Sequence, residues 1–168
     1  MTLDQLNALD REAFTRALGA VFEHSPWVAE RAWPQRPFAS LEALHAAMCE
    51  AVRQAGPAAQ LNLIRAHPQL AGRAAIAGEL SADSAREQRG AGLDQCSPEE
   101  YLRLTELNAH YQARFGFPYI LAVRGHTRTS ILADLAARLP NARQAEMLEA
   151  LRQIERIAAL RLADLVVA

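Results

Sequence analysis

The sequence predicts an all-α protein: a single domain over residues 1–168, built as a compact bundle of about eight helices. Apolar residues recur at intervals of three and four, as in Phe14, Leu18, Val21 and Phe22, which is the period of one helix face. No stretch shows the apolar and polar alternation that marks a strand. With 168 residues, 51% of them hydrophobic, the chain is long enough for one sizeable core and too short for two ordinary domains.

Residues that cap helix N-termini mark the expected helix starts. These are Thr2 with Gln5, Asp10, Ser25 before Pro26, Ser40, and Ser97 with Pro98 and Glu100. Gly56 and Gly116 mark two stops. The last helix is expected to run from a cap at Asn141 to about Val167. Its expected inner stripe consists of Leu148, Leu151, Ile154, Ala158, Leu162 and Leu165.

Charge and hydropathy exclude several partners. A formal net charge of -1 and the lack of a basic run give no electrostatic footprint for nucleic acid or for a membrane surface. The chain starts MTLDQLNALD and has no run of ~18 apolar residues. We therefore expect a cytoplasmic protein with no membrane partner. Cys49 and Cys96 form no disulfide framework, so both are expected to be reduced thiols.

All 18 basic residues are arginine, and the sequence has no lysine. Schiff-base chemistry needs a side-chain amine, and a phosphate-binding loop of the Walker type needs its lysine. The sequence therefore excludes both kinds of chemistry.

His67 lies in the stretch LIRAHPQLAGR, directly before Pro68. A proline disfavours helical geometry in the residue before it, so the preceding helix should end here, and Pro68 is expected to open the next turn. The imidazole is thus placed by stiff backbone. It either carries chemistry or simply caps a helix end.

A second candidate is the polar face in LSADSAREQRGAGL. Ser84, Glu87, Gln88 and Ala91 stand at i, i+3, i+4 and i+7, so they share one helical face that can bind a polar ligand. A solvated helix surface would have the same pattern. Ser84 with Glu87 also fits a capping box.

Two further segments complete the candidates. RFGFPYILAV ends a helix at Gly116 and continues as apolar, non-helical chain, whose unpaired backbone groups a heterocycle with amide edges would satisfy. Alternatively, these residues only fill the core. Arg161 stands in the apolar row of Ile154, Ala158 and Leu165, so its guanidinium needs an anion. That anion is either an internal carboxylate, such as Asp164 or a distant Glu, or the carboxylate of a substrate.

The segments HPQLAGR, SAREQRGAGL, FGFPYI and RIAALRL, in this order, resemble the OHCU decarboxylase family, which acts on 2-oxo-4-hydroxy-4-carboxy-5-ureidoimidazoline (OHCU). The resemblance extends from about Leu6 to Leu165. Gln69 stands where the family usually has Asp, and Tyr119 where it usually has Phe. The ending DLVVA lacks the peroxisomal tripeptide of animal members, which agrees with a cytoplasmic protein of bacterial type.

The resemblance implies an all-helical enzyme, homodimeric and without a metal or other cofactor, that converts OHCU to (S)-allantoin in urate degradation. It implies that His67 is the acid/base, that Glu87 orients the substrate and that Arg161 binds an anionic or carbonyl oxygen. The implied substrate-binding residues are Pro68, Ser84, Gln88, Tyr119, Ile120, Leu121, Ala122 and Val123. Decarboxylation leaves an electron pair on carbon, and OHCU can accept it in its own ring C=N, so a lysine is not required.

Two other functions stay open at this point. One is a helical module that binds a ureide without converting it. The other is a metal-dependent hydrolase, for which His45 and Cys49, at i and i+4, are the only ligand-like pair. That pair lacks a third ligand and fits a core helix better.

Overall fold

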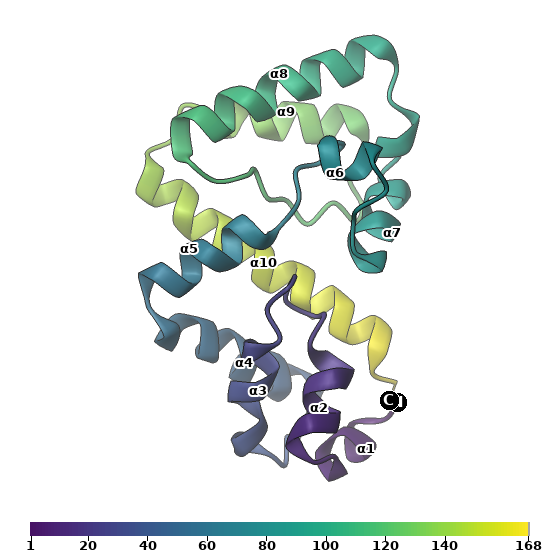
Figure 1. Ribbon diagram of the computed structural model, residues 1–168, viewed down its shortest axis with the longest axis vertical. Helices are drawn as coiled ribbons and strands as arrows, with labels where there is room; N and C mark the ends of the chain where they lie inside the picture. Colours follow the sequence, from purple (N-terminus) through teal and green to yellow (C-terminus); the bar gives the residue numbers. More distant parts are fainter. Residues whose placement is uncertain (168) are drawn as a thin grey trace. The chain divides into compact units, whose positions relative to one another are not determined.

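The computed structural model describes residues 1–167, except for the side chains of Arg73 and Ala74. It confirms the all-α prediction, because the described residues contain no strand, only an isolated bridge between Thr2 and Val167. The α-helices are α1 (Leu3–Ala8), α2 (Arg11–Leu18), α3 (Trp27–Ala32), α4 (Leu41–Ala55), α5 (Pro57–Ala66), α6 (Arg73–Ile76), α7 (Ala82–Gly90), α8 (Pro98–Phe115), α9 (Arg128–Arg138) and α10 (Arg143–Leu165). Two 3-10 helices, η1 (Trp33–Gln35) and η2 (Leu93–Gln95), complete the set (Figure 1).

Most of the expected helix ends are confirmed. Thr2 and Ser97 form capping boxes, and the side chains of Asp10 and Ser40 cap α2 and α4. Gly116 ends α8 in the left-handed conformation, with φ of 76°, which glycine adopts without steric cost.

Two expected starts are each wrong by one residue. The cap of α3 is Pro26, with no side-chain bond, because the Ser25 hydroxyl donates to the Glu23 carbonyl oxygen instead. Helix α10 begins at Arg143, because the Asn141 side chain is used to donate to Glu146 Oε2, at 3.2 Å.

The expected inner stripe of α10 is correct in its middle and wrong at its ends. Ile154, Ala158 and Leu162 are buried, whereas Leu148 and Leu165 are 62% and 44% exposed. The buried row starts at Glu146 and Ala150, and Leu148, about 200° around the helix from each of them, faces the other way.

The chain divides into two compact units. The first comprises Met1–Ala66 and Ile154–Ala168, and the second is His67–Gln153. In the first unit α3 packs against α2 and α4, and α4 packs against α5. The two chain ends of this unit lie side by side (Figure 1), where the Val167 N–H donates to the Met1 carbonyl oxygen.

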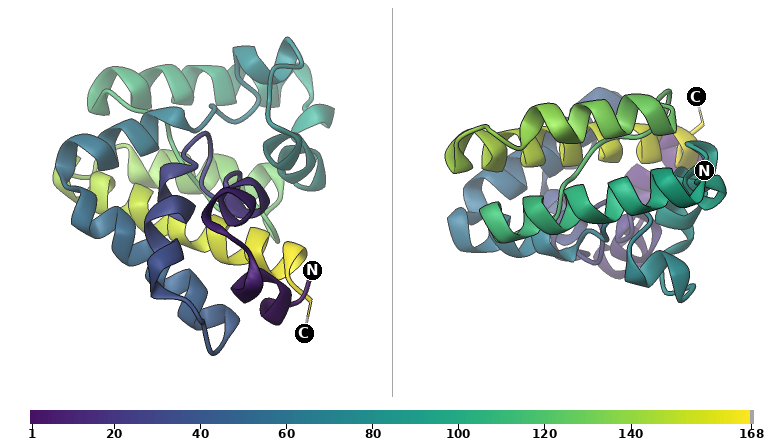
Figure 2. Two further views of the ribbon diagram at one scale, coloured as in Figure 1. Left: turned by 60° about the horizontal axis from the view of Figure 1, so that its bottom comes forward. Right: turned by 90° about the horizontal axis from the view of Figure 1, so that it is seen from above.

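In the second unit α8 and α9 pack side by side, as the view from above shows (Figure 2). The chain between them returns from the end of α8 to the start of α9, so both helices run in the same direction (Figure 1). A cluster of buried aromatic rings joins α8 to this returning chain: Tyr111, Phe115, Phe117 and Tyr119. Such rings contribute a large part of the buried apolar area of a small core. Among the described helices, none is both long and apolar enough to cross a membrane.

Candidate active site

His67 lies at the joint that the sequence predicted. Helix α5 ends at Ala66, one residue earlier, and His67 is 7% exposed. The prediction that Pro68 opens the next turn is wrong, since residues 68–72 are not helical and α6 starts at Arg73. Ala71 in this stretch has φ of 49°, a left-handed conformation that interrupts any helix. We call residues 67–72 the histidine loop.

Two buried amide side chains hold the backbone of the histidine loop. Gln88 of α7 accepts from the Ala71 N–H at 2.9 Å and donates to the Gln69 carbonyl oxygen at 3.3 Å. Asn108 of α8 donates to the Leu70 carbonyl oxygen at 3.0 Å. A buried backbone group needs a partner, and these amides supply it. The loop that carries His67 is therefore fixed to two helices.

Helix α7 presents the polar face predicted from its sequence, and that face is not a solvated surface. Ser84, Gln88 and Ala91 are 5%, 5% and 7% exposed, and Glu87 is half-buried. The capping box of Ser84 and Glu87 is wrong. Ser81 caps α7 by accepting from the Ser84 N–H at 3.2 Å. Ser84 and Glu87 thus lie inside the helix, so helix capping does not account for them.

The 119–123 segment, from Tyr119 to Val123, is non-helical and buried throughout, with 1% to 6% of each residue exposed. The Ile120 carbonyl oxygen accepts from Arg138 Nη1 at 2.7 Å, and the Ala122 N–H donates to Gln153 Oε1 at 3.0 Å. Arg138 comes from α9 and Gln153 from α10, so two helices hold this segment.

Tyr119 stands where the resemblance leads one to expect Phe, and its hydroxyl group donates to the Asp134 carboxylate. Burial, with that hydrogen bond, raises the pKa of Tyr119 well above its ordinary value, so the hydroxyl stays a neutral donor. The guanidinium of Arg138 lies 4.6 Å from the centre of the same ring. The hydroxyl that a phenylalanine would lack is therefore bound on α9.

Arg161 is paired with an internal carboxylate, which was one of the two anions expected for it. It is 2% exposed, and its Nη1 lies 2.8 Å from Glu23 Oε2 and 3.1 Å from the Ala20 carbonyl oxygen. Glu23 is therefore the anion that neutralises the buried guanidinium. Arg161 belongs to the first unit, whereas all the other predicted site residues belong to the second.

The pair considered for a metal site forms ordinary core contacts. His45 Nε2 lies 2.7 Å from the Glu155 carbonyl oxygen and 3.3 Å from Cys49 Sγ. Burial raises the pKa of the Cys49 thiol to about 12, so it is a protonated thiol in the core. Within the described part of the chain, no three His, Cys, Asp or Glu side chains form a group that fits a metal ion.

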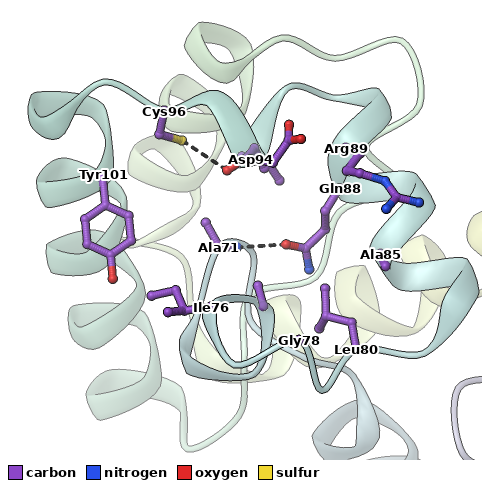
Figure 3. Close-up of a pocket in the computed structure, with 12 residues that line it drawn as sticks. Ala71, Ile76, Gly78, Leu80, Ala85, Gln88, Arg89, Asp94, Cys96 and Tyr101 are labelled. Atoms are coloured by element: carbon purple, nitrogen blue, oxygen red, sulfur yellow. Dashed lines mark hydrogen bonds between the residues drawn. The ribbon is translucent and has the colours of Figure 1, made fainter.

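A cavity of about 570 Å³ lies beside Gln88 and Ala71 (Figure 3). Ile76, Leu80 and Tyr101 also contribute to its walls, and the figure shows the bond between Gln88 and Ala71 among the lining residues. His67, Ser84 and Glu87 are not among its lining residues. The predicted catalytic residues therefore do not form this cavity.

Four residues of the site region were not predicted from the sequence, although a signal for some of them exists: Arg138, Gln153, Asn108 and Glu146. Arg138 continues the apolar row of Ile131 and Leu135 at i+7, and Glu146 stands four residues before Ala150. The argument applied to Arg161, that a charged residue within an apolar row needs an opposite charge, would have linked these two residues as candidates for a pair.

Comparison with known proteins gives the same family as the motifs. The family model described as OHCU decarboxylase matches residues 7–163. The chain is 41% identical to the 2-oxo-4-hydroxy-4-carboxy-5-ureidoimidazoline decarboxylase of Halalkalicoccus jeotgali, over 99% of this chain and 93% of that protein. It is 46% identical to the uric acid degradation bifunctional protein PucL of Bacillus subtilis, over 98% of this chain and 33% of that protein.

Among solved structures, the crystal structure of (S)-allantoin synthase has a TM-score of 0.78 to this chain and 28% sequence identity. The match covers 99% of this chain and 54% of that one. The chain thus spans a third of the bifunctional relative and about half of the crystallised synthase, but nearly all of the Halalkalicoccus decarboxylase. On these matches, the chain belongs to the OHCU decarboxylase family.

Proposed function

We propose that this protein converts OHCU to (S)-allantoin and CO₂ in urate degradation, with His67 as the acid/base and without a cofactor. The position of His67 is the observation that supports this proposal. The chain belongs to a decarboxylase family, and His67 is a buried titratable residue on a loop that is hydrogen-bonded to α7 and α8. Fixed placement is what proton transfer to one face of a bound ring requires.

In the proposed reaction the bond from the ring carbon to the carboxylate breaks. Its electron pair moves into the adjacent ring C=N, so no amine cofactor is needed as an electron sink. The ring then takes up one proton on carbon for each CO₂ released. His67 is the proposed source of that proton, because a neutral-pH acid/base is the ordinary role of imidazole.

The other proposed contacts follow from the family resemblance. Glu87 orients the ureido or hydroxyl groups, Ser84 and Gln88 bind polar edges, and Pro68 forms one wall. The amide of Gln88 already bonds twice to the histidine loop, and its second N–H remains for substrate. Arg161 binds an anionic or carbonyl oxygen of the substrate.

We further propose that residues 1–168 act as one catalytic domain in a cytoplasmic homodimer. Size-exclusion chromatography with light scattering tests the dimer directly.

The test of the function is turnover of freshly generated OHCU, followed by its loss of absorbance, with the chirality of allantoin read by circular dichroism. We expect accelerated OHCU loss and (S)-allantoin as the product. Activity should survive exhaustive chelation and need no added cofactor. A protein that binds allantoin but leaves OHCU decay unchanged is a ureide-binding module. Activity restored only by a metal would overturn the cofactor-free proposal.

A further inference from the structure

The 119–123 segment is held at two alternate residues. Arg138 binds the Ile120 carbonyl oxygen and Gln153 binds the Ala122 N–H. The backbone groups of Tyr119 and Leu121, which alternate with these two residues, take no part in the bonds to α9 and α10.

The backbone groups of Tyr119 and Leu121 are buried and lack protein partners within the described part of the chain. Among the described residues, no hydrogen bond joins the backbone N–H or C=O of Tyr119 or Leu121 to another protein group. Tyr119 and Leu121 are only 1% and 6% exposed. Buried backbone groups are nearly always paired, so the backbone of Tyr119 and Leu121 is suited to bind a ligand that supplies both a donor and an acceptor.

Arg138 is itself fixed by a buried network. Its Nε lies 2.8 Å from Glu146 Oε1, and Glu146 is 1% exposed. The Tyr111 hydroxyl donates to the same oxygen at 2.6 Å. Burial opposes the charge of Arg138, but the hydrogen bond and charge of Glu146 outweigh it and raise the pKa of Arg138. Hence the donor that faces Ile120 is a permanent cation in one orientation.

Gln153 is oriented by a second bond. Its Nε2 donates to Glu149 Oε1 at 2.8 Å, one turn earlier on α10. This bond assigns the nitrogen and leaves the amide oxygen for Ala122. The two holding groups thus differ in charge and come from different helices, but they bind residues of one short segment.

We propose that Arg138 and Gln153 are positioning residues for decarboxylation: they hold Ile120 and Ala122 so that the backbone of Leu121 and Tyr119 binds an N–H and C=O edge of the substrate. This inference rests on the proposed function, since OHCU has such amide edges in its ring and ureido group. Neither side chain touches the reacting atoms. Their effect is on the placement of the ring relative to the acid/base, where small displacements are costly.

The first experiment measures kcat and KM for OHCU in Gln153→Leu and Arg138→Lys variants. Leucine has the size of glutamine but no acceptor for Ala122. Lysine keeps a cation for Glu146 but lacks the fork that binds Glu146 and Ile120 at once. We expect kcat/KM to fall about 10-fold to 10²-fold in each. Gln153→Glu keeps an acceptor oxygen but sets a second carboxylate against Glu149, so the double variant Gln153→Glu with Glu149→Gln, which keeps both bonds with the donor and acceptor exchanged, should restore most of the loss.

Matched controls use the same substitutions nearby. Gln144 is an exposed residue of α10, and Arg143 donates to the Phe115 carbonyl oxygen, outside the segment. Gln144→Leu and Arg143→Lys should therefore have wild-type kinetics. If Arg138→Lys does not fold, Gln153→Leu decides the question.

The second experiment uses amide hydrogen exchange by NMR, with (S)-allantoin as the probe. Allantoin should slow exchange at Leu121 about tenfold or more in the wild type. Gln153→Leu should speed exchange at Ala122 and reduce the protection at Leu121. If the wild type is active but the variants keep its kinetics and its amide exchange rates, this inference is overturned and the proposed function is not. A wild type inactive on OHCU would overturn the proposed function before any variant is measured.

Discussion

The partly buried histidine loop and the fully buried 119–123 segment are both non-helical stretches of one unit, but they are held by different chemistry. Neutral amides, Gln88 and Asn108, hold the loop. The segment is held by one amide and by a guanidinium that pairs with a buried carboxylate.

The difference follows from what each stretch presents. The loop offers carbonyl oxygens at Gln69 and Leu70 and an N–H at Ala71, and an amide can both donate and accept. The Ile120 carbonyl needs only a donor, and Arg138 supplies a charged one. Charged hydrogen bonds are stronger, but a buried cation must be neutralised. We therefore expect the segment to depend on an ion pair that the loop does without.

The largest effect should come from the group that the loop carries. His67→Asn should leave the fold and much of the allantoin affinity unchanged, because the shape and the amide contacts of the loop remain. Turnover should fall roughly 10²-fold to 10⁴-fold, the usual contribution of a positioned acid or base. Turnover, allantoin affinity and thermal stability are measured on one preparation. Lower stability with near-normal turnover would mean that the histidine only holds the joint.

The next effect tests the charged network. Glu146→Gln keeps the shape of the side chain but leaves Arg138 without its closest anion, since Asp134 is 3.7 Å away and partly exposed. The free energy of unfolding should fall by about 3–5 kcal/mol, as for other broken buried pairs. Urea denaturation measures it. Glu50→Gln, in a surface pair with Arg53, is the matched control and should cost less than about 1 kcal/mol.

Arg161 gives a second buried ion pair, in the other unit, for which we predict a substrate contact as well. Arg161→Lys keeps a cation for Glu23 and loses the planar fork. We expect kcat/KM to fall by the order of 10²-fold or more, as for the loss of one preorganised donor, while the fold survives. Steady-state kinetics with OHCU test this. Normal kinetics would show that Arg161 only pairs with Glu23 and does not contact the substrate.

Sequence patterns predicted the helices well because local rules determine them. Thr2, Asp10, Ser40 and Ser97 cap helices as expected, since each bond spans only three residues. The failures occur where a distant partner competes. Asn141 donates to Glu146 rather than capping α10, and Ser84 is buried inside a helix that Ser81 caps.

The candidate site was predicted less completely, for a related reason. The break at His67 follows from Pro68, its neighbour in the chain, but the partners that hold the loop come from 17 to 38 residues away. The pairing of Ile120 with Arg138 likewise depends on how the returning chain packs against α9. No local pattern specifies that register, so the sequence indicated which segments matter but not what fixes them.

A smaller effect is expected from the neutral brace of the histidine loop. Gln88→Leu removes the partners of the Ala71 N–H and the Gln69 carbonyl, which should cost about 1–3 kcal/mol of stability without substrate. Turnover should also fall, because the loop carries His67. Gln60→Leu is the control, since Gln60 also donates to two carbonyl oxygens, those of Val52 and Arg53, yet should retain turnover. If Gln88 only contacts substrate, affinity will drop and stability will not.

The smallest effect should follow from Tyr119→Phe, which removes a single hydroxyl from the 119–123 segment. Its partner Asp134 is partly exposed, so water can replace the lost donor, and the free energy of unfolding should fall by about 0.5–1.5 kcal/mol. Turnover should stay within about twofold, because the ring, its packing against Tyr111 and the backbone bonds at Ile120 and Ala122 all remain. Denaturation and OHCU kinetics on the same variant test both parts. A tenfold loss of turnover would show that the bond to Asp134 also positions the segment, and that the holding network is larger than Arg138 and Gln153.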